Sequence, residues 1–250
     1  MRVDVFFGAQ RIAPPDVAGR VAVVIDVLRA STSIATALAN GARAIIPFET
    51  SEEAVTRAKA FERSEVRLAG ERRMRAIAGF DLGNSPLEYT REAVEGKTVL
   101  MTTTNGTPAI MNSAGARDVV IASYVNYTAV LAMLRAALRG GTDVTVVCAG
   151  TERQFGLEDA GCAGRFVYNV VKRLGGPNVE LNDAAQACTL IDRKYGDQLL
   201  KLFDASEHGR ALRDAGFAAD LTACAALDAH PVIPIYQDRQ ITKLGPDRER

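Results

Sequence analysis

Residues Val21–Ser33 read VAVVIDVLRASTS, and the fold class can be inferred from this segment. Its first part, Val21–Val27, is apolar and β-branched almost throughout, and such a run predicts a strand that is covered on both faces of a sheet. A helical pattern follows over Ile34–Ala39 and ends at Asn40 and Gly41, which are typical of a helix C-terminus. A buried strand that leads through a polar loop into a helix is the repeating unit of an α/β protein.

The same alternation recurs along the chain. Further strands are predicted at Val3–Phe7, Arg43–Pro47, Val66–Ala69, Thr98–Met101, Val119–Ala122, Val144–Cys148 and Val232–Tyr236. Helices are predicted at Ser51–Phe61, Asn126–Leu138 and Ala160–Leu174, and helical patterns with breaks near Gly196, Gly209 and Gly216 fill Leu181–Ala229. The alternation predicts a three-layer α/β/α fold with a largely parallel or mixed central sheet. Because no linker or repeat interrupts it, we expect one domain over residues 1–250, with the helix-rich segment 181–229 packed on the sheet rim.

The charge balance excludes some classes of partner. Lysine and arginine number 30, and aspartate and glutamate also number 30, so the formal net charge is zero. This balance argues against a protein that coats nucleic acid or binds membranes through basic residues. No apolar run approaches the roughly 18 residues of a membrane span, and the first residues lack the apolar core of a secretion signal. We therefore expect a cytoplasmic protein that binds neither nucleic acid nor a membrane.

The cysteines and histidines of the sequence limit the kinds of metal site that the protein can form. No two of the four cysteines form a CxxC pair, and each lies in an apolar or small-residue stretch, so we expect reduced core residues. The sequence has two histidines, His208 and His230, which are too few for a histidine-based metal cage. Any bound metal is therefore expected to be a hard, oxygen-liganded ion such as Mg²⁺.

His208 has two interpretations. It would serve as a proton donor if the helical tail folds over the strand ends, whereas a surface histidine near a helix break is the commoner case. His230, which precedes a proline, is expected to be structural.

Ligands of open α/β sheets bind beyond the carboxyl ends of the strands, so the residues there are the first candidates. Asp26 lies at the carboxyl end of the predicted strand Val21–Val27, and Arg29, Ser31 and Thr32 follow before a helix. These side chains offer a metal-binding carboxylate, a guanidinium that pairs with phosphate, and hydroxyl donors. The alternative is a helix N-cap with an incidental salt bridge, but an acid within an apolar strand is unfavourable without a partner.

The loop after the fourth predicted strand carries Glu71 and Arg72, and the loop Gly79–Pro86 carries Asn84 and Ser85. The adjacent acid and base of the first loop suit a metal and an oxyanion, respectively. The second loop has the composition of a tight turn that exposes amide donors. Asparagine and glycine also form ordinary turns, and that interpretation stays open.

The loop after the fifth predicted strand is rich in hydroxyl groups. It contains Thr103, Thr104, Asn105, Gly106 and Thr107, and it enters a short helix. Hydroxyls, free amides at a helix start and a glycine that permits close approach together favour an anion cradle. The alternative is a capped turn. The loop is not a P-loop, because no GxxxxGK[ST] pattern and no lysine occur in it.

A fourth polar junction follows the strand that ends at Cys148. The chain passes through a short loop to Glu158 and Asp159, at the start of a helix. Neighbouring carboxylates there suit Mg²⁺, with water completing the coordination. The alternative is that the acids only complement the helix dipole.

Several catalytic motifs are absent from the sequence. It contains no DxDxT of aspartyl phosphatases, no GxSxG of α/β-hydrolases, and no cysteine and arginine at the spacing used by cysteine phosphatases. No GxGxxG follows a strand, which argues against a dinucleotide site.

The four polar junctions, together with the segment Ser206–Gly209, occur in order between about Val3 and Tyr236, and as a set they resemble the 2-phosphosulfolactate phosphatase family. The resemblance implies an α/β/α fold and a Mg²⁺-dependent phosphatase. Its reaction converts 2-phospho-3-sulfolactate to 3-sulfolactate and phosphate, a step of coenzyme M biosynthesis. The family also occurs in bacteria that do not make coenzyme M, so another phosphorylated 2-hydroxy acid stays open as the substrate.

The residues and the resemblance lead to one hypothesis. The expected catalytic residues are Asp26, Arg29, Glu71 and Asp159. The expected Mg²⁺ ligands are Asp26, Glu158 and Asp159. The expected substrate-binding residues are Arg29, Ser31, Thr32, Arg72, Asn84, Ser85, Thr103, Thr104, Asn105, Gly106 and Thr107. The sequence does not decide whether Asp26 or a metal-activated water attacks phosphorus.

Two other functions fit the same loops. One is a nucleotide-binding phosphotransferase that holds ATP phosphates, and the other is a non-catalytic anion-binding protein. The expected partner is a small anionic phosphorylated substrate, and a homodimer is the default oligomer.

Overall fold

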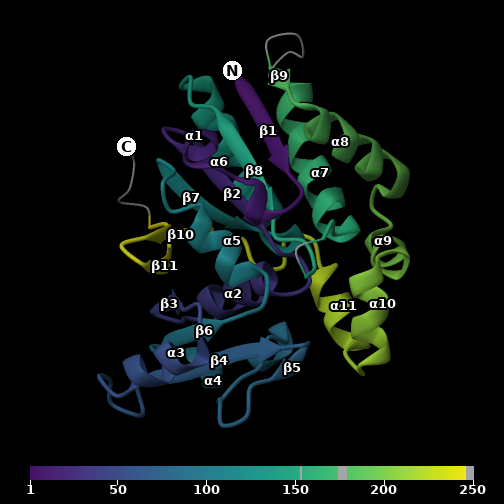
Figure 1. Ribbon diagram of the computed structural model, residues 1–250. Helices are drawn as coiled ribbons and strands as arrows, with labels where there is room; N and C mark the ends of the chain where they lie inside the picture. The colour runs from purple at the N-terminus through teal and green to yellow at the C-terminus, as the bar shows by residue number, and fades with distance from the viewer. Residues whose placement is uncertain (153, 174–178, 246–250) are drawn as a thin grey trace.

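The computed structural model describes residues 1–152, 154–173 and 179–245, and their strands form one sheet (Figure 1). The strands are β1 Arg2–Phe6, β2 Val21–Ile25, β3 Ala44–Pro47, β4 Val66–Arg72, β5 Arg75–Ala76, β6 Thr98–Thr102, β7 Asp118–Ala122, β8 Val144–Cys148, β9 Glu180–Leu181, β10 Pro234–Gln237 and β11 Gln240–Lys243. Their order is β5-β4-β6-β3-β11-β10-β7-β2-β8-β1-β9.

Helices connect most of the strands. The α-helices are α1 Pro14–Val17, α2 Ala30–Ala39, α3 Ser51–Ala58, α4 Arg91–Val94, α5 Gly106–Asn112, α6 Tyr127–Arg139, α7 Leu157–Arg173, α8 Asp183–Tyr195, α9 Leu199–Ala205, α10 Glu207–Asp214 and α11 Ala218–Cys224. Short 3-10 helices are η1 Ala9–Arg11, η2 Pro86–Glu88 and η3 Tyr124–Asn126. The predicted α/β/α architecture with a mixed sheet is confirmed.

Side chains of β2 show why the sheet is covered on both faces. Ile25 belongs to the apolar cluster that includes Phe166 of α7, whereas Val24 belongs to a second cluster that includes Ile34 of α2. Successive side chains of a strand point to opposite faces, so the two clusters lie on the two sides of the sheet. Every residue of β2 is buried, which explains why its sequence is apolar throughout.

Apart from the edge strand β5, which is antiparallel to β4, the sheet consists of two parallel groups joined by a hairpin. Strands β4, β6 and β3 are parallel, and so are β7, β2, β8, β1 and β9. The hairpin β10–β11 lies between the groups and is antiparallel to both neighbours. Three successive antiparallel pairings reverse the strand direction, so the two groups run in opposite senses along the sheet. In Figure 1, β4 crosses the lower part of the molecule and β1 descends through the upper part.

The loops of the two groups nevertheless meet. The backbone N–H of Glu152, after β8, donates to Oδ1 of Asn105, after β6, at 3.1 Å. A Cβ added to Gly106, also after β6, would lie 2.7 Å from Oδ2 of Asp26, after β2. The candidate residues of separate strand groups are therefore brought into one place by the shape of the whole sheet.

The predicted elements differ from the observed ones in a few places. Strand β11 was not predicted, because its sequence QITK is largely polar and only Ile241 is buried. The predicted helix break near Gly209 is wrong: Gly209 lies inside α10, and the break is at Ser206. A Cβ at Gly209 would lie 2.0 Å from the carbonyl oxygen of Phe203, so glycine serves close packing there. Leu174, the last residue of a predicted helix, lies outside the described residues.

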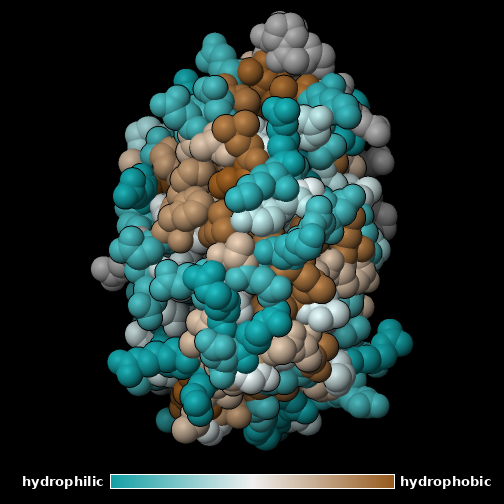
Figure 2. All heavy atoms as spheres, turned by 90° about the vertical axis from the view of Figure 1, so that its right-hand side faces the viewer, coloured by the Kyte–Doolittle hydropathy of each residue, from teal (hydrophilic) through white to brown (hydrophobic). Residues whose placement is uncertain are grey.

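The helical C-terminal part packs beside α7 and reaches the strand ends. Arg165 of α7 lies 3.3 Å from Asp192 of α8, and His208 of α10 lies 3.4 Å from Glu158 of α7. Figure 2 shows this side of the molecule, where hydrophilic residues predominate and apolar residues form separate patches. Within the described chain, no helix combines the length and apolarity needed to cross a membrane.

All four cysteines are buried and free, as predicted. Burial raises the pKa of the thiols of Cys148 and Cys162 well above the ordinary value. These side chains therefore serve as small apolar core residues.

Candidate active site

A cavity of about 300 Å³ lies where the loops after β2, β4, β6 and β8 meet α10. It is lined by Asp26, Leu28, Arg29, Glu71, Arg73, Met74, Asn84, Thr104, Asn105, Thr151, Glu152, Glu207, His208 and Ala211. Predicted residues from three of the four polar junctions thus line one cavity, and Glu158, from the fourth, contacts the lining residue His208.

Asp26 follows directly after β2 and is 6% exposed. The backbone N–H of Ala30 donates to its Oδ1 at 3.3 Å, and the N–H of Asp26 itself donates to Ser31 Oγ at 2.9 Å. Burial raises the pKa of Asp26 to about 6, and the nearby charges of Glu71 and Glu158 add to this effect, while His208 opposes it. A bound cation would therefore stabilise the ionised form of Asp26.

Asp159 joins the ends of two strands. Its Oδ1 accepts the N–H of Val27 at 2.8 Å, and its Oδ2 accepts the N–H of Gly150 at 3.0 Å. Burial, followed by the charges of Glu158 and Asp26, raises its pKa well above the ordinary value. Its position holds the loops after β2 and β8 together, and its role as metal ligand and catalytic residue stays a prediction.

Glu158 and His208 form a pair at the edge of the cavity. Nδ1 of His208 lies 3.4 Å from Oε1 of Glu158 and 3.1 Å from Oγ1 of Thr151. The side chain of His208 is 12% exposed. Burial opposes its protonation, but the hydrogen bond and charge of Glu158 outweigh this, and the pKa of His208 is raised. The helical tail does fold over the strand ends, which is the condition for the predicted proton donor.

Arg29 is held by residues that the sequence did not single out. Its Nη1 donates to Oδ2 of Asp220 at 2.6 Å, and its Nη2 donates to the carbonyl of Met74 at 2.9 Å. The guanidinium lies 4.3 Å from the ring centre of Phe217. Oγ of Ser85 donates to the other carboxylate oxygen of Asp220 at 2.7 Å. An aspartate in the first turn of a predicted helix is typical of dipole complementation, so the sequence carried no signal for this role.

Glu71 connects two of the loops. Its Oε1 accepts the N–H of Thr104 at 2.7 Å, and its Oε2 accepts the N–H of Met74 at 3.0 Å. Thr104 and Asn105 line the cavity, whereas the hydroxyls of Thr103 and Thr107 each accept a backbone N–H of the other residue at 3.0 Å. The loop after β6 is thus a fixed turn that presents part of its backbone to the cavity.

Four predicted substrate-binding side chains bond elsewhere. Arg72 donates to Oγ1 of Thr102 at 2.9 Å and to the carbonyl of Glu49 at 3.3 Å, while its neighbour Arg73 lines the cavity. Ser31 Oγ accepts the N–H of Asp26, the hydroxyl of Thr32 bonds to the carbonyl of Val27 and to the hydroxyl of Ser123, and Ser85 bonds to Asp220. Their predicted contacts with substrate stay predictions.

The residues present fit a hard divalent cation. No group of three or more His, Cys, Asp or Glu side chains placed to hold a metal occurs among the described residues. Mg²⁺, however, commonly uses one or two carboxylates and completes its shell with water and substrate phosphate. Oδ1 of Asn84 is buried and, within the described part of the chain, has no hydrogen-bond partner. Asn84 and Asp26 line the same cavity, so they supply oxygen donors of the kind that Mg²⁺ prefers.

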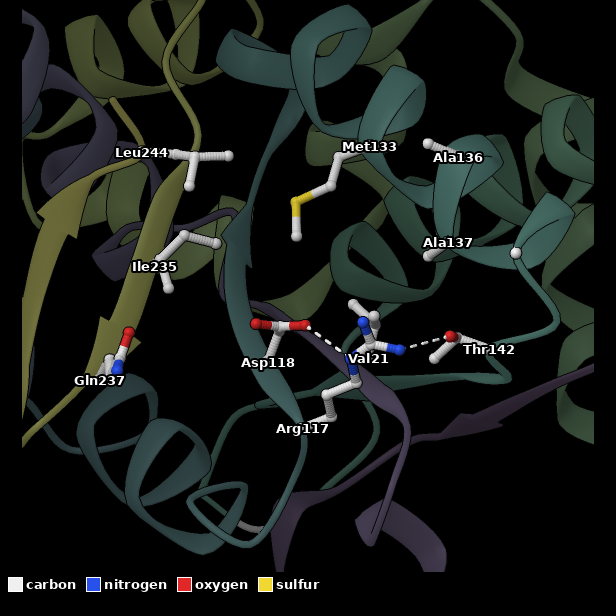
Figure 3. Close-up of a pocket in the computed structure, with 11 residues that line it drawn as sticks. Val21, Arg117, Asp118, Met133, Ala136, Ala137, Thr142, Ile235, Gln237 and Leu244 are labelled. Carbon is white, nitrogen blue, oxygen red and sulfur yellow. Dashed lines mark hydrogen bonds and ion pairs between the residues drawn. The ribbon is translucent and has the colours of Figure 1, made fainter. Parts of the chain in front are cut away.

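A second hollow, of about 550 Å³, lies at the opposite strand ends (Figure 3). It is bordered by Val21 and Asp118, the first residues of β2 and β7. Nη1 of Arg117 donates to Oγ1 of Thr142 at 2.9 Å, and Nε lies 3.6 Å from Asp118. The described residues that line this hollow include none of the predicted site residues. The cavity beside Asp26 is therefore the candidate active site.

Comparisons with known proteins support the resemblance found in the sequence. The family model described as 2-phosphosulpholactate phosphatase matches residues 8–239. A "probable 2-phosphosulfolactate phosphatase" of Symbiobacterium thermophilum is 44% identical over 235 residues, which cover 92% of this chain and 98% of that protein. A protein of the same name from Clostridium botulinum is 39% identical over 244 residues, 98% of this chain and 100% of the relative. The chain belongs to the 2-phosphosulfolactate phosphatase family.

Proposed function

We propose that this protein is a Mg²⁺-dependent phosphatase that hydrolyses 2-phospho-3-sulfolactate, or a related phosphorylated 2-hydroxy acid, to the hydroxy acid and phosphate. The relatives are named for this activity. The observation that carries the proposal is the position of Asp26: a buried carboxylate at a strand end, in one cavity with Arg29 and His208.

The charges of the cavity support a cation requirement. Four carboxylates, those of Asp26, Glu71, Glu152 and Glu207, line it together with two guanidinium groups. One of the two, that of Arg29, is already paired with a carboxylate outside the lining. A substrate that carries phosphate, sulfonate and carboxylate groups would be repelled by this surplus of acids. A divalent cation on Asp26 would remove the repulsion and offset the charge that develops in phosphoryl transfer.

The chain's own residues have defined tasks in the proposed reaction. Arg29, fixed by Asp220 and Phe217, orients the phosphoryl group by charge-assisted hydrogen bonds. Either an oxygen of water or an oxygen of Asp26 forms the new bond to phosphorus while the bond from phosphorus to the C2 oxygen breaks. If Asp26 attacks, water then hydrolyses the phosphoaspartate, which releases phosphate and restores the carboxylate. His208 gives a proton to that leaving oxygen. Glu158, whose Oε1 lies 3.4 Å from Nδ1 of His208, favours the protonated form of the imidazole.

Phosphate release tests the proposal directly. Wild type, Asp26→Asn and the distant control Asp118→Asn are assayed on 2-phosphosulfolactate and 2-phospholactate, with Mg²⁺ and with EDTA. We expect release by wild type and by the control, loss in EDTA with recovery on adding Mg²⁺, and a loss of at least about 100-fold in Asp26→Asn. Metal-independent release, or a fully active Asp26→Asn protein, contradicts the proposal.

Two further measurements extend the assay. Acid quenching under single-turnover conditions traps a phosphoryl group on Asp26 if that residue attacks phosphorus, and traps none if water attacks directly. A rise in melting temperature with ATP, combined with no phosphate release from either substrate, would instead favour a nucleotide-dependent phosphotransferase.

A further inference from the structure

The hairpin between β4 and β5 directs one arginine into the cavity and another away from it. Its two turn residues, Arg73 and Met74, have φ of 51° and 67°, in the left-handed region that side chains other than glycine seldom adopt. Glu71 holds this turn, because its two carboxylate oxygens accept the N–H groups of Met74 and of Thr104. The turn is therefore fastened to the loop after β6, and the direction of each arginine follows from it.

Among the described residues, three basic side chains line the cavity, and two of them lie beside an acid. Arg29 is bonded to Asp220, and His208 lies beside Glu158. For Arg73, no hydrogen bond or ion pair to another described residue occurs, and the residue is exposed. A guanidinium at the cavity mouth without a protein partner is available for an anion of the substrate.

The chemistry of the substrate identifies that anion. In 2-phospho-3-sulfolactate, the carboxylate is attached to the same carbon as the phosphate ester, and the sulfonate is one carbon farther away. With the phosphoryl group at Asp26 and Arg29, the sulfonate is therefore the anion farther from phosphorus along the covalent chain, and it can reach a guanidinium elsewhere in the cavity lining. The planar fork of arginine donates two parallel hydrogen bonds to such an oxyanion.

We propose that Arg73 binds the sulfonate of the substrate and thereby determines the preference for sulfonated over unsulfonated 2-phospho acids. This inference rests on the proposed function. Arg73 is not one of the groups that act on phosphorus. Removing its side chain should therefore weaken binding of sulfonated substrates and leave the chemical step intact.

Steady-state kinetics on two substrates test the inference. Arg73→Gln and the control Arg75→Gln, which removes the same charge from the same hairpin outside the cavity lining, are compared with wild type. For Arg73→Gln we expect KM for 2-phosphosulfolactate to rise about tenfold, with little change for 2-phospholactate and in kcat. Arg73→Lys should recover part of the loss, because it restores the charge without the fork. If 2-phospholactate is hydrolysed too slowly, its inhibition constant takes the place of its KM.

The outcomes separate the two proposals. Wild type that releases no phosphate from either substrate contradicts the proposed function itself. Active wild type with unchanged KM in Arg73→Gln overturns only the role of Arg73. An equal rise in KM for both substrates also overturns it, because that result assigns Arg73 to the carboxylate that both substrates share.

Discussion

The guanidinium of Arg29 and the carboxylate of Asp220 lie 2.6 Å apart, and their side chains are 2% and 3% exposed. The pair joins the loop after β2 to α11, 191 residues later in the chain. A buried charge of this kind is stable only while its partner is present. The C-terminal helices therefore position a residue of the cavity as well as covering it.

Asp220→Asn should reduce both stability and activity. The substitution leaves the buried Arg29 without a counter-charge, and breaking such a pair lowers the free energy of unfolding by about 3–5 kcal/mol. Urea denaturation measures the loss, and phosphate release measures the effect on turnover. Asp204→Asn, which removes a half-exposed partner of Arg213, should change stability by less than about 1 kcal/mol. Equal losses in the two variants would show that the buried pair has no special role.

Asp26→Asn should stabilise the metal-free protein at neutral and alkaline pH. The folded state raises the pKa of Asp26 from 3.8 to about 6, so ionisation of this carboxyl destabilises the fold as pH rises through that range. The gain from the substitution is on the order of 1–3 kcal/mol above pH 7 and should disappear below about pH 4. Urea titrations in EDTA at several pH values measure it. A gain that is independent of pH would mean that the charge of Asp26 is not its cause.

Asp4 should show the opposite pH dependence. Burial disfavours its charge, but hydrogen bonds from Arg2 and Arg20, both at 2.7 Å, outweigh burial and lower its pKa below 3.8. Ionised Asp4 therefore stabilises the fold fully at pH values above its pKa in the unfolded chain. This stabilisation is lost as the pH falls through its lower pKa in the folded protein. Asp4→Asn should lower the free energy of unfolding by about 1–3 kcal/mol at pH 7 and by less at pH 3. Asp238→Asn, in an exposed turn, is the control and should match wild type at both pH values.

Gly106→Ala should impair catalysis. A Cβ at this position would lie 2.5 Å from Cβ of Ala30 and 2.7 Å from Oδ2 of Asp26, so Asp26 or the loop after β6 has to move. A displacement of about 1 Å in an active site lowers turnover by about 100-fold. Gly115→Ala, whose nearest neighbour atom is 3.8 Å away, should keep wild-type activity. Comparable activity of the two variants would show that the close contact is not needed.

His208→Gln should reveal whether this residue protonates the leaving group. We expect kcat on 2-phosphosulfolactate to fall by about 100-fold, because its alkoxide leaving group needs a proton. With 4-nitrophenyl phosphate, whose phenolate leaves unprotonated, the fall should be much smaller. His230→Gln serves as the control, since His230 does not line the cavity. Equal losses on both substrates would assign His208 to binding or positioning.

Much of the fold could be predicted because it depends on local patterns. The β-branched run of β2, the helix after it and the hydroxyl-rich turn after β6 are each recognisable within about ten residues, since burial and capping impose their patterns locally. The rule that ligands bind beyond strand ends then selected Asp26, Arg29, Glu71, Asn84, Thr104 and Asn105, all of which line the cavity. Local patterns in the sequence thus predict the fold class and two of the four acids that line the cavity, Asp26 and Glu71.

Which of these residues meet, and which way their side chains point, depends on packing between distant parts of the chain. The two strand groups run in opposite senses, so only the shape of the complete sheet brings the loop after β6 to Asp26. Asp220 became the partner of Arg29 through a contact between segments 191 residues apart, for which no local pattern exists. Arg73 lines the cavity, and the predicted Arg72 does not, because a left-handed turn held by Glu71 sets the direction of each side chain. Such contacts depend on packing between distant elements, and periodicity along the chain carries no information about them.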